Sequence, residues 1–491
     1  MMKVKSLVFV FLALFSTTAE AQTVLSRLDL VRKDPKPNFF EYSPVDGGLI
    51  TFGPTSIQSS RYLGLVKYNS DLREEWSKEV VEQNGRKNVD FVSVIGPHIL
   101  VFTSEFFPSE GVIKTFYNSF DLNGNQVIED GLLSVVPNQK EQKVDLQYVL
   151  SPNKRRLLAF KNLANRKESE TLLYYLFDEE GEVVQDGEID LRYPDNKFSI
   201  SNIRVSNLGN IYVLGKFTRS AVSTNAQDFE HMIYRYDLAT REGVEIKIDI
   251  GNRFITDLAF RVDRNEDIYL AGFYSNLGTD MQAGTLLQKI SSSGELLLQA
   301  LDAFEEGFLS NYLSSSQIDR GRELRNFFLD PEDGIILRSD GGVLLIAEKF
   351  YVTYQSYRDM YGGWVDRALY HYEDVIFTSV SADGRIEWHS IVDKNQMSES
   401  PESLSFFSAV GSQGSYIFYE YKPQRLPINV YFNNVGISGQ VSDRVPLLPD
   451  FKYGDMFFPR QSVQINGEEA LIVYLGNRGK NLSVVKVKIG N

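Results

Sequence analysis

The side chains that most often perform catalysis or bind metals are few in this sequence, and they are widely spaced. The four histidines are His98, His231, His371 and His389. We expect each to lie in a different structural unit, and their spacing matches no metal-ligand motif. The sequence contains no cysteine and no H-E-x-x-H, G-x-S-x-G, P-loop or strand-linked G-x-G-x-x-G motif. It therefore predicts no metal and no cofactor, and it excludes chemistry that depends on a thiolate.

Two acidic segments are similar to the start of a calcium-binding loop. Asp263, Asn265 and Asp267 alternate along the chain, and Asp121-Leu-Asn-Gly-Asn125 is a comparable run. An EF-hand loop also needs a glycine at its sixth position and a glutamate at its twelfth, and neither follows Asp263. Asp and Asn side chains favour β-turns by accepting hydrogen bonds from nearby backbone N–H groups. We interpret both segments as turns.

Carboxylates are the one catalytic side-chain type in abundance, because the chain has 65 Asp and Glu residues. A pair of them could suit glycoside cleavage, although with this number some pairs are close by chance. The alternative function is therefore a glycan-binding or glycan-active protein that uses carboxylates and aromatics. The formal net charge of −14 disfavours nucleic acid and anionic lipid as partners.

A segment at 353–370 and its flanks are rich in aromatic residues, with Gly362-Gly363 near the middle. We expect a β-ribbon that extends two strands beyond the body of the fold. Tyr and Trp are good contact residues and also good strand formers. The rings therefore form either a contact surface for protein or glycan, or cross-strand pairs that stabilise the ribbon. The candidate binding residues are Tyr354, Tyr357, Tyr361, Trp364, Tyr370 and Tyr372.

The elements that position these residues repeat with a period of about fifty residues. The clearest copy has alternating runs at 254–262 and 268–274, followed by runs at 285–290 and 295–299. Short alternating runs bounded by turn residues are typical of strands. The turn between the third and fourth strands recurs at steps of about 52 to 59 residues, with one step of about 90. Removing 305–326 and 353–370 as insertions restores the period.

The repeats predict an all-β protein, a single closed β-propeller over residues 22–491 with eight four-stranded blades. Seven blades is the alternative, if the weakly patterned last unit is not a separate blade. That unit has strands near Met456, at 470–474 and at 482–489, but no fourth strand. Residues 24–31 form a spare strand ahead of the first unit. We expect this spare strand, around Leu28–Val31, to pair with Leu482–Ile489, because pairing the two ends removes exposed sheet edges.

Several turns between third and fourth strands resemble exported bacterial β-propeller repeats with the pattern apolar-x-Lys-apolar-x-x-x-Gly-x-x-x-Trp. The segment from Leu65 to Trp76 matches with Leu72 in place of the glycine, and the segment from Val375 to Trp388 matches with Ser379 in place of the lysine. Ser151-Pro-Asn-Lys-Arg is similar to the propeller turn Ser-Pro-Asp-Gly-Lys. The whole chain resembles exported bacterial propellers of uncharacterised function. The resemblance implies the fold and leaves the activity open.

One face of the expected ring is plain and the other carries long loops. Turns between first and second and between third and fourth strands share one face and are short. Second-to-third loops and blade-to-blade connections share the other face, where both insertions fall. We expect the insertion at 305–326 to be a short helix with Asp302 as N-cap and Glu305 three residues on, either packed on the ring or used in binding. Both insertions should lie on neighbouring blades and form the main recognition surface.

Residues 1–21 are typical of a signal peptide, with Lys3 and Lys5, an apolar run at 7–15 and Ala19-Glu20-Ala21 at the cleavage site. No later run is long enough for a membrane helix. We therefore expect an exported protein, periplasmic or secreted. The leading function is a non-enzymatic protein-interaction or scaffold module whose partner is an unknown protein or glycan.

Overall fold

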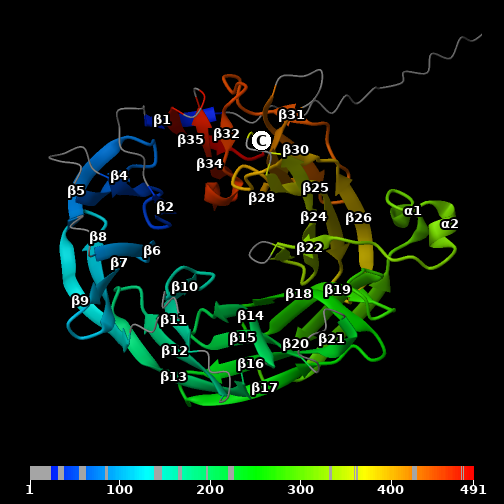
Figure 1. Ribbon diagram of the computed structural model, residues 1–491, viewed down its shortest axis with the longest axis horizontal. Helices are drawn as coiled ribbons and strands as arrows, with labels where there is room; N and C mark the ends of the chain where they lie inside the picture. Colours follow the sequence, from blue (N-terminus) through cyan, green and yellow to red (C-terminus); the bar gives the residue numbers. More distant parts are fainter. Residues whose placement is uncertain are drawn as a thin grey trace, which may run out of the picture.

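The chain forms eight antiparallel sheets that are arranged around a common axis (Figure 1). The computed structural model describes residues 24–490 except 31–37, 55–61, 83–86, 138–145, 164–168, 195–196, 219–225, 331–333, 359, 361–362, 423–427, 477 and 479. Residues 1–21, the expected signal peptide, lie outside the described part. Each sheet has a path of four strands, and we call the sheets blades 1 to 8. The arrangement is that of a β-propeller.

Blades 1 to 4 contain β2 to β17 in chain order. Blade 1 has β2 (Phe39–Tyr42), β3 (Leu49–Pro54), β4 (Tyr62–Tyr68) and β5 (Glu74–Glu82). Blade 2 has β6 (Lys87–Ile95), β7 (His98–Phe107), β8 (Val112–Asp121) and β9 (Gln126–Pro137). Blade 3 has β10 (Gln147–Leu150), β11 (Leu157–Leu163), β12 (Ser169–Phe177) and β13 (Val183–Pro194). Blade 4 has β14 (Phe198–Val205), β15 (Ile211–Thr218), the 3-10 helix η1 (Ala226–Asp228), β16 (Phe229–Asp237) and β17 (Glu242–Ile248).

Blades 5 to 8 contain the remaining strands. Blade 5 has β18 (Phe254–Val262), β19 (Ile268–Ser275), β20 (Gly284–Ile290) and β21 (Leu296–Ala303). Helices α1 (Glu306–Leu309) and α2 (Ser315–Ile318) follow. Blade 6 has β22 (Phe327–Leu329), β23 (Ile335–Leu337), β24 (Val343–Arg358), β25 (Trp364–Val380), β26 (Ile386–Val392) and β27 (Gln396–Ser398). Blade 7 has β28 (Phe407–Gly411), β29 (Gly414–Tyr421), β30 (Asn429–Gly436) and β31 (Val445–Pro446). Blade 8 has β32 (Met456–Phe457), the 3-10 helix η2 (Pro459–Gln461), β33 (Val463–Asn466), β34 (Glu469–Gly476), β35 (Asn481–Lys488) and β1 (Val24–Leu30).

The core lies between neighbouring blades, where the alternating side chains of one sheet meet those of the next. Leu214 of blade 4, for example, shares a buried cluster with Phe260 and Leu270 of blade 5. Second strands are covered on both faces, and every residue of β19 is buried. This explains why the second strand of each repeat is the most continuously apolar run in the sequence. Among the described residues, no helix is long and apolar enough to cross a membrane.

The two ends of the described chain meet in blade 8, as expected from the spare strand. Strand β1 pairs antiparallel with β35, with Leu28 opposite Val484 and Leu30 opposite Leu482. Apolar side chains of blade 1, including Tyr42 and Leu72, share a buried cluster with those of blade 8. The pairing is confirmed, although Val31 lies outside the described residues. The seven-blade alternative is wrong, because the last unit forms a sheet of its own.

The insertion at 305–326 contains two helices of four residues rather than one, and they lie at the outer edge of the ring (Figure 1). Asp302 is not an N-cap, because it pairs with Thr285 inside the sheet of blade 5. Glu305 is the N-cap residue of α1, without a side-chain capping bond. Strand β21 continues to Ala303, so Asp302 lies inside a strand although the sequence around it resembles a helix N-terminus.

The repeat motif with tryptophan joins successive blades. The Trp76 indole N–H of blade 1 donates to the Leu122 carbonyl of blade 2 at 3.0 Å, and the ring lies against Gly124. In blade 1 the glycine of the motif is replaced by Leu72, which adopts φ +62° and is buried against blade 8. Burial of its side chain offsets the cost of the left-handed backbone.

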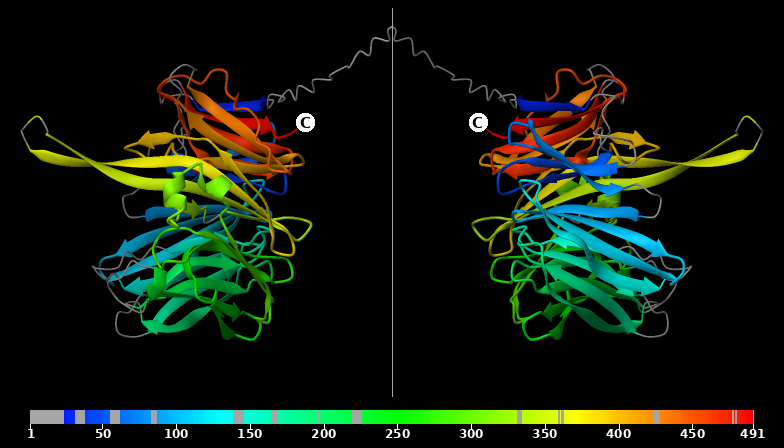
Figure 2. Two further views of the ribbon diagram at one scale, coloured as in Figure 1. Left: turned by 90° about the vertical axis from the view of Figure 1, so that its right-hand side faces the viewer. Right: turned by 90° about the vertical axis from the view of Figure 1, so that its left-hand side faces the viewer.

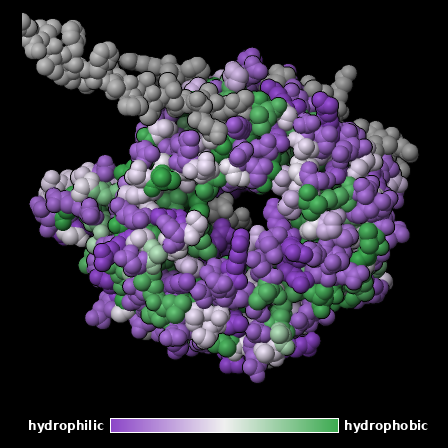
Figure 3. Space-filling view, turned by 180° about the vertical axis from the view of Figure 1, so that it is seen from behind, coloured by the Kyte–Doolittle hydropathy of each residue, from purple (hydrophilic) through white to green (hydrophobic). Residues whose placement is uncertain are grey.

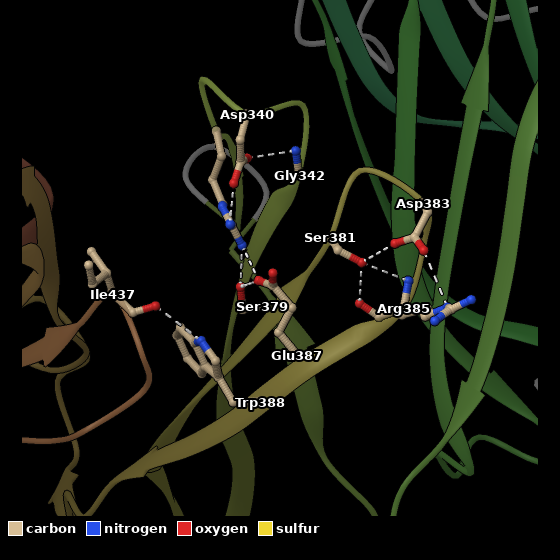
Figure 4. Close-up of polar contacts among 10 residues, drawn as sticks. Asp340, Gly342, Ser379, Ser381, Asp383, Arg385, Glu387, Trp388 and Ile437 are labelled. Atoms are coloured by element: carbon tan, nitrogen blue, oxygen red, sulfur yellow. Dashed lines mark hydrogen bonds and ion pairs between the residues drawn. The ribbon is translucent and has the colours of Figure 1, made fainter.

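Blade 6 replaces the motif lysine without losing its ion pairs (Figure 4). In blade 1, Lys67 bridges Asp46 and Glu75 at 2.5 and 2.9 Å. In blade 6 the equivalent carboxylates are Asp340 and Glu387, and both pair with Arg338 of the turn between β23 and β24. Ser379, at the lysine position, donates to Glu387 at 2.7 Å. The cation that pairs with the two carboxylates therefore lies on a strand in blade 1 and in a turn in blade 6. Blade 6 lacks the motif lysine but keeps an equivalent set of ion pairs.

Candidate functional site

The most prominent surface feature is a ribbon formed by β24 and β25, which projects beyond the ring on one face (Figure 2). These strands have 16 and 17 residues, whereas the equivalent strands of blade 5 have eight and seven. Their register runs from Val343 opposite Val380 to Arg358 opposite Trp364. A register shift between Glu348 and Phe350 marks the point where the ribbon leaves the blade. The ribbon expected at 353–370 is present.

Most of the predicted aromatics lie on one face of this ribbon. Residues opposite one another in an antiparallel pair point to the same side, as do alternate residues along a strand. The register places Tyr354 and Trp364 on the same face as Tyr370 and Tyr372. The side chains of Tyr354 and Trp364 are 75% and 68% exposed. The guanidinium of Arg358 lies 5.1 Å from the Trp364 ring centroid on that face. Tyr354 and Trp364 are the two accessible rings of the aromatic face.

The other predicted residues have different environments. Tyr357 lies on the opposite face beside Arg367, with the guanidinium 5.7 Å from its ring centroid. Tyr361 lies outside the described residues. Strand β27 pairs with β25 at Tyr370 and Tyr372, so these two belong to the base of the ribbon. Tyr372 is half-buried with its ring 4.7 Å from that of Phe350. Tyr372 therefore forms a cross-strand pair with Phe350 that stabilises the ribbon.

A buried polar network anchors the base of the ribbon between blades 6 and 7. The ammonium of Lys394, fully buried, lies 2.5 Å from Glu348 Oε1 and donates to the carbonyl of Tyr372 at 3.1 Å. Ser405 Oγ donates to the other oxygen of Glu348 at 2.6 Å. Burial lowers the pKa of Lys394, while Glu348 opposes the shift. Because a buried charge needs its partners, this network holds the base of the ribbon against the segment that leads into blade 7.

The helical insertion packs against the same blade. The Phe308 ring of α1 stacks on His389 of β26 at 4.9 Å, and Phe304 lies 5.8 Å from the same imidazole. Tyr312 packs edge-on against Phe327 at 5.2 Å. The aromatic residues of the insertion are therefore part of the ring's core, as the packing interpretation anticipated. The insertion and the ribbon base both line a cavity of about 450 Å³.

Carboxylates in that cavity are already engaged. Glu323 is buried and accepts hydrogen bonds from Ser275 Oγ at 2.6 Å and from the backbone N–H of Asn276 at 2.8 Å. Asp374 accepts a hydrogen bond from the backbone N–H of Lys394 at 3.4 Å. Burial raises the pKa of Asp374. Both acids therefore accept hydrogen bonds from neighbouring segments of the fold.

The histidines do not converge. His371 and His389 both lie in blade 6, which corrects the expectation of four separate units. His371 Nε2 lies 2.8 Å from Thr353 Oγ1, and His389 Nδ1 lies 2.9 Å from Thr378 Oγ1. His98 Nδ1 lies 2.9 Å from the Glu179 carbonyl. Burial, with Lys216 nearby, lowers the pKa of His231 to about 4. Within the described ranges, no group of three or more His, Asp or Glu side chains could hold a metal ion.

The two acidic segments form turns. Asp263 Oδ1 accepts hydrogen bonds from the backbone N–H groups of Asn265 and Asp267 at 2.8 and 3.0 Å. Asp121 Oδ1 accepts equivalent bonds from Asn123 and Asn125 at 2.9 and 2.8 Å. The carboxylates close their own turns, as the turn interpretation requires.

Sequence reasoning missed a cavity of about 620 Å³ in the centre of the ring. The inner strands of blades 1, 6, 7 and 8 line it, together with Lys154 from a turn of blade 3. Figure 3 shows the central hollow from the face opposite the ribbon. These residues are spread over most of the chain, so no local pattern connects them. The one sequence signal was Lys154 itself, which stands where the related turn has glycine.

No family model matches the sequence, and no curated protein matches it. Solved structures with a similar arrangement include the polysaccharide lyase Uly1, at 10% identity and a TM-score of 0.38 over 82% of this chain and 89% of that one. The β-propeller domain of the Trilobed protease from Pyrococcus furiosus has 12% identity and a TM-score of 0.33, with coverages of 75% and 96%. Prolyl oligopeptidase B from Galerina marginata has 11% identity and a TM-score of 0.31, with coverages of 72% and 39%. At these scores, the description as a propeller rests on the chain's own eight sheets.

Proposed function

We propose that this protein is an exported, closed β-propeller that acts as a non-enzymatic interaction module and binds a partner through the aromatic face of its ribbon. The observation that carries the proposal is the exposure of Tyr354 and Trp364 on one face of a projecting ribbon. The composition of residues 1–21 supports export, and the pairing of β1 with β35 supports closure.

Exposure of these rings favours a contact surface over a purely structural ribbon. A stabilising cross-strand pair removes much of each ring from water, as at Phe350 and Tyr372. Covering a large apolar side chain contributes about 1.5 to 3 kcal/mol. Rings held on a paired backbone also lose little conformational entropy when they bind. A partner that covers Tyr354 and Trp364 together would therefore gain a substantial part of its affinity from them.

The engaged carboxylates favour a non-enzymatic role. Glycoside cleavage needs two carboxyl groups that flank the sugar, and the hydrogen bonds of Glu323 and Asp374 beside the ribbon base support a structural role for these two acids. Glycan binding without cleavage is the second candidate, because the open faces of Tyr354 and Trp364 could stack on sugar rings. Arg358 and Asp366 on the same face supply polar groups for either kind of partner.

Capture experiments with matched variants test the proposal. The mature protein is cross-linked in a cell-envelope fraction and the captured proteins are identified, and a parallel set of polysaccharides is tested by affinity electrophoresis. The double variant Tyr354→Ser, Trp364→Ser should lose the captured partner or the polysaccharide retardation. Tyr453→Ser is the control, since Tyr453 is 82% exposed and belongs to the connection between β31 and β32 rather than to the ribbon. Equal capture by the double variant would contradict the proposal.

A further inference from the structure

The central cavity has a mixed lining. Figure 3 shows the hollow at the centre of the ring from the face opposite the ribbon. Its charged members are Glu41, Lys154, Asp330 and Arg460. Aromatic side chains, among them Phe39 and Phe406, supply an apolar wall. A volume of about 620 Å³ lies in the range of small-molecule sites.

Lys154 occupies a backbone position that normally requires glycine. Its N–H donates to the Ser151 carbonyl at 2.8 Å, as Gly209 N–H does to Ser206 in the matching turn of blade 4. The φ angles are +54° for Lys154 and +100° for Gly209. A side chain in this left-handed region is disfavoured. Such an outlier at the edge of a cavity suggests that its side chain has a use.

Glu266 is a second non-glycine residue at this turn position, and its side chain has a clear structural role. Glu266 of blade 5 has φ +64° and is buried, and its carboxylate accepts hydrogen bonds from Asn210 Nδ2 and Tyr212 Oη at 3.0 and 2.8 Å. Those bonds to blade 4 offset the strained backbone. The ammonium of Lys154 makes no hydrogen bond or ion pair in the part of the chain that the structure describes. It lies 5.9 Å from the ring centroid of Tyr42, which belongs to blade 1.

The other charges of the cavity leave Lys154 without a full counterion. Asp330 of blade 6 already pairs with Arg460 of blade 8 at 2.9 Å. Burial raises the pKa of Glu41 to about 7, although Lys154 opposes the shift. Near neutral pH the Glu41 carboxyl is thus protonated in a large fraction of molecules, and a protonated carboxyl donates a hydrogen bond. Because Asp330 and Arg460 neutralise each other, the ammonium of Lys154 and a partly protonated Glu41 remain, and they suit an anionic group better than a cationic one.

We propose that the central cavity is a second binding site, separate from the ribbon, which takes a small ligand bearing a carboxylate. The carboxylate pairs with the ammonium of Lys154, and the Glu41 carboxyl donates a hydrogen bond to it. The remainder of the ligand packs against Phe39 and Phe406. Such a carboxylate comes either from a sugar acid or from the C-terminus of a short peptide. The inference does not depend on the proposed role of the ribbon.

Calorimetric titration at pH 6 tests the site with two pairs of probes. Glucuronate is compared with glucose, and the dipeptide Ala-Phe with its C-terminal amide. We expect one of the two carboxylates to bind and its neutral counterpart to bind at least tenfold more weakly. The pair that shows the difference identifies the source of the carboxylate. If neither carboxylate binds at millimolar concentration, or if acid and neutral probes bind equally, the proposal is wrong.

Variants assign the interaction to Lys154. Lys154→Met should weaken carboxylate binding at least tenfold, and Lys154→Gly should do the same while raising the melting temperature, because it relieves the left-handed backbone. The gain in stability shows that the Gly variant is folded. Lys452→Met is the matched control, since Lys452 is exposed and lies outside the cavity lining. Retention of full affinity by Lys154→Gly would overturn the assignment, and the ribbon variant should bind the probe like the wild type.

Discussion

The indole nitrogen of Trp388 donates a hydrogen bond to the carbonyl oxygen of Ile437 at 3.2 Å, joining blade 6 to blade 7 (Figure 4). Gly439 lies against the same indole ring, and a β-carbon there would come within 2.7 Å of Trp388 Cδ2. Gly439 also has φ +85°. Contact between the Trp388 indole and the turn of blade 7 therefore depends on the absence of a side chain at Gly439.

Gly439→Ala should consequently separate the two blades. We expect it to lower the free energy of unfolding by about 2 kcal/mol, through the clash and the left-handed backbone together. Urea denaturation monitored by tryptophan fluorescence gives the value. Gly307→Ala is the control, because a β-carbon at Gly307 meets no atom within 4 Å. Equal stability of the two variants would show that the tryptophan contact can adjust.

Removal of β1 should open the last blade. A protein that begins at residue 31 lacks the strand that pairs with β35 and the side chains of Leu28 and Leu30, which pack on blade 8. We expect a marked fall in the melting temperature and aggregation that increases with concentration, because the edge of β35 becomes available. A protein that begins at residue 23 is the reference. An unchanged melting temperature would mean that the pairing adds little to stability.

Substitutions of the aromatic residues of the ribbon should fall into two groups by their effect on the stability of the protein. Tyr354→Ser and Trp364→Ser replace exposed rings, so each should change the free energy of unfolding by less than about 0.5 kcal/mol. Tyr372→Ser removes the contact with Phe350 and should cost about 2 kcal/mol. Thermal denaturation by circular dichroism distinguishes the groups. A large loss in Trp364→Ser would identify that ring as structural.

Glu41 should make stability depend on pH. Its pKa in the folded protein, about 7, exceeds its usual value of 4.5, so the folded state binds the proton more tightly than the unfolded state. The stabilisation by this proton is complete below pH 4.5 and is lost as the pH rises through 7. Glu41→Gln should therefore have nearly the stability of the wild type at pH 4.5 and exceed it at pH 8, by roughly 3 kcal/mol. The free energy of unfolding of both proteins, measured with urea at the two pH values, tests this prediction. A constant difference between the proteins at the two pH values would contradict the assignment.

The strand pattern of the repeats was sufficient to predict eight blades, the ribbon and the pairing of the two ends. These features follow from local alternation and turn spacing, which the sequence displays directly. Asp302 was misplaced because a strand continued through a capping signal. Tyr372 was grouped with exposed rings because strand β27, only three residues long, gives no sequence signal of its own.

The central cavity could not be predicted in the same way. Glu41 and Arg460 are separated by most of the chain, and only the arrangement of blades around one axis brings them to the same lining. The sequence did show, however, that Lys154 stands where the related propeller turn has a glycine. The two departures differ: Glu266 accepts hydrogen bonds from Asn210 and Tyr212, whereas the described residues provide no hydrogen bond or ion pair for the ammonium of Lys154.

The hydrogen bond from Ser483 to Asp29 at 2.5 Å joins residues 454 positions apart. Closing so long a loop has a large entropic cost that only the finished neighbouring blades can offset. We therefore expect β1 to pair with β35 after the neighbouring blades have folded. Its sequence suits this delay, because Arg27 and Asp29 interrupt its apolar residues and form an ion pair at 2.8 Å. Charges within an unpaired strand discourage its association with other chains, so we expect the segment that pairs with β35 to be protected from aggregation before it docks.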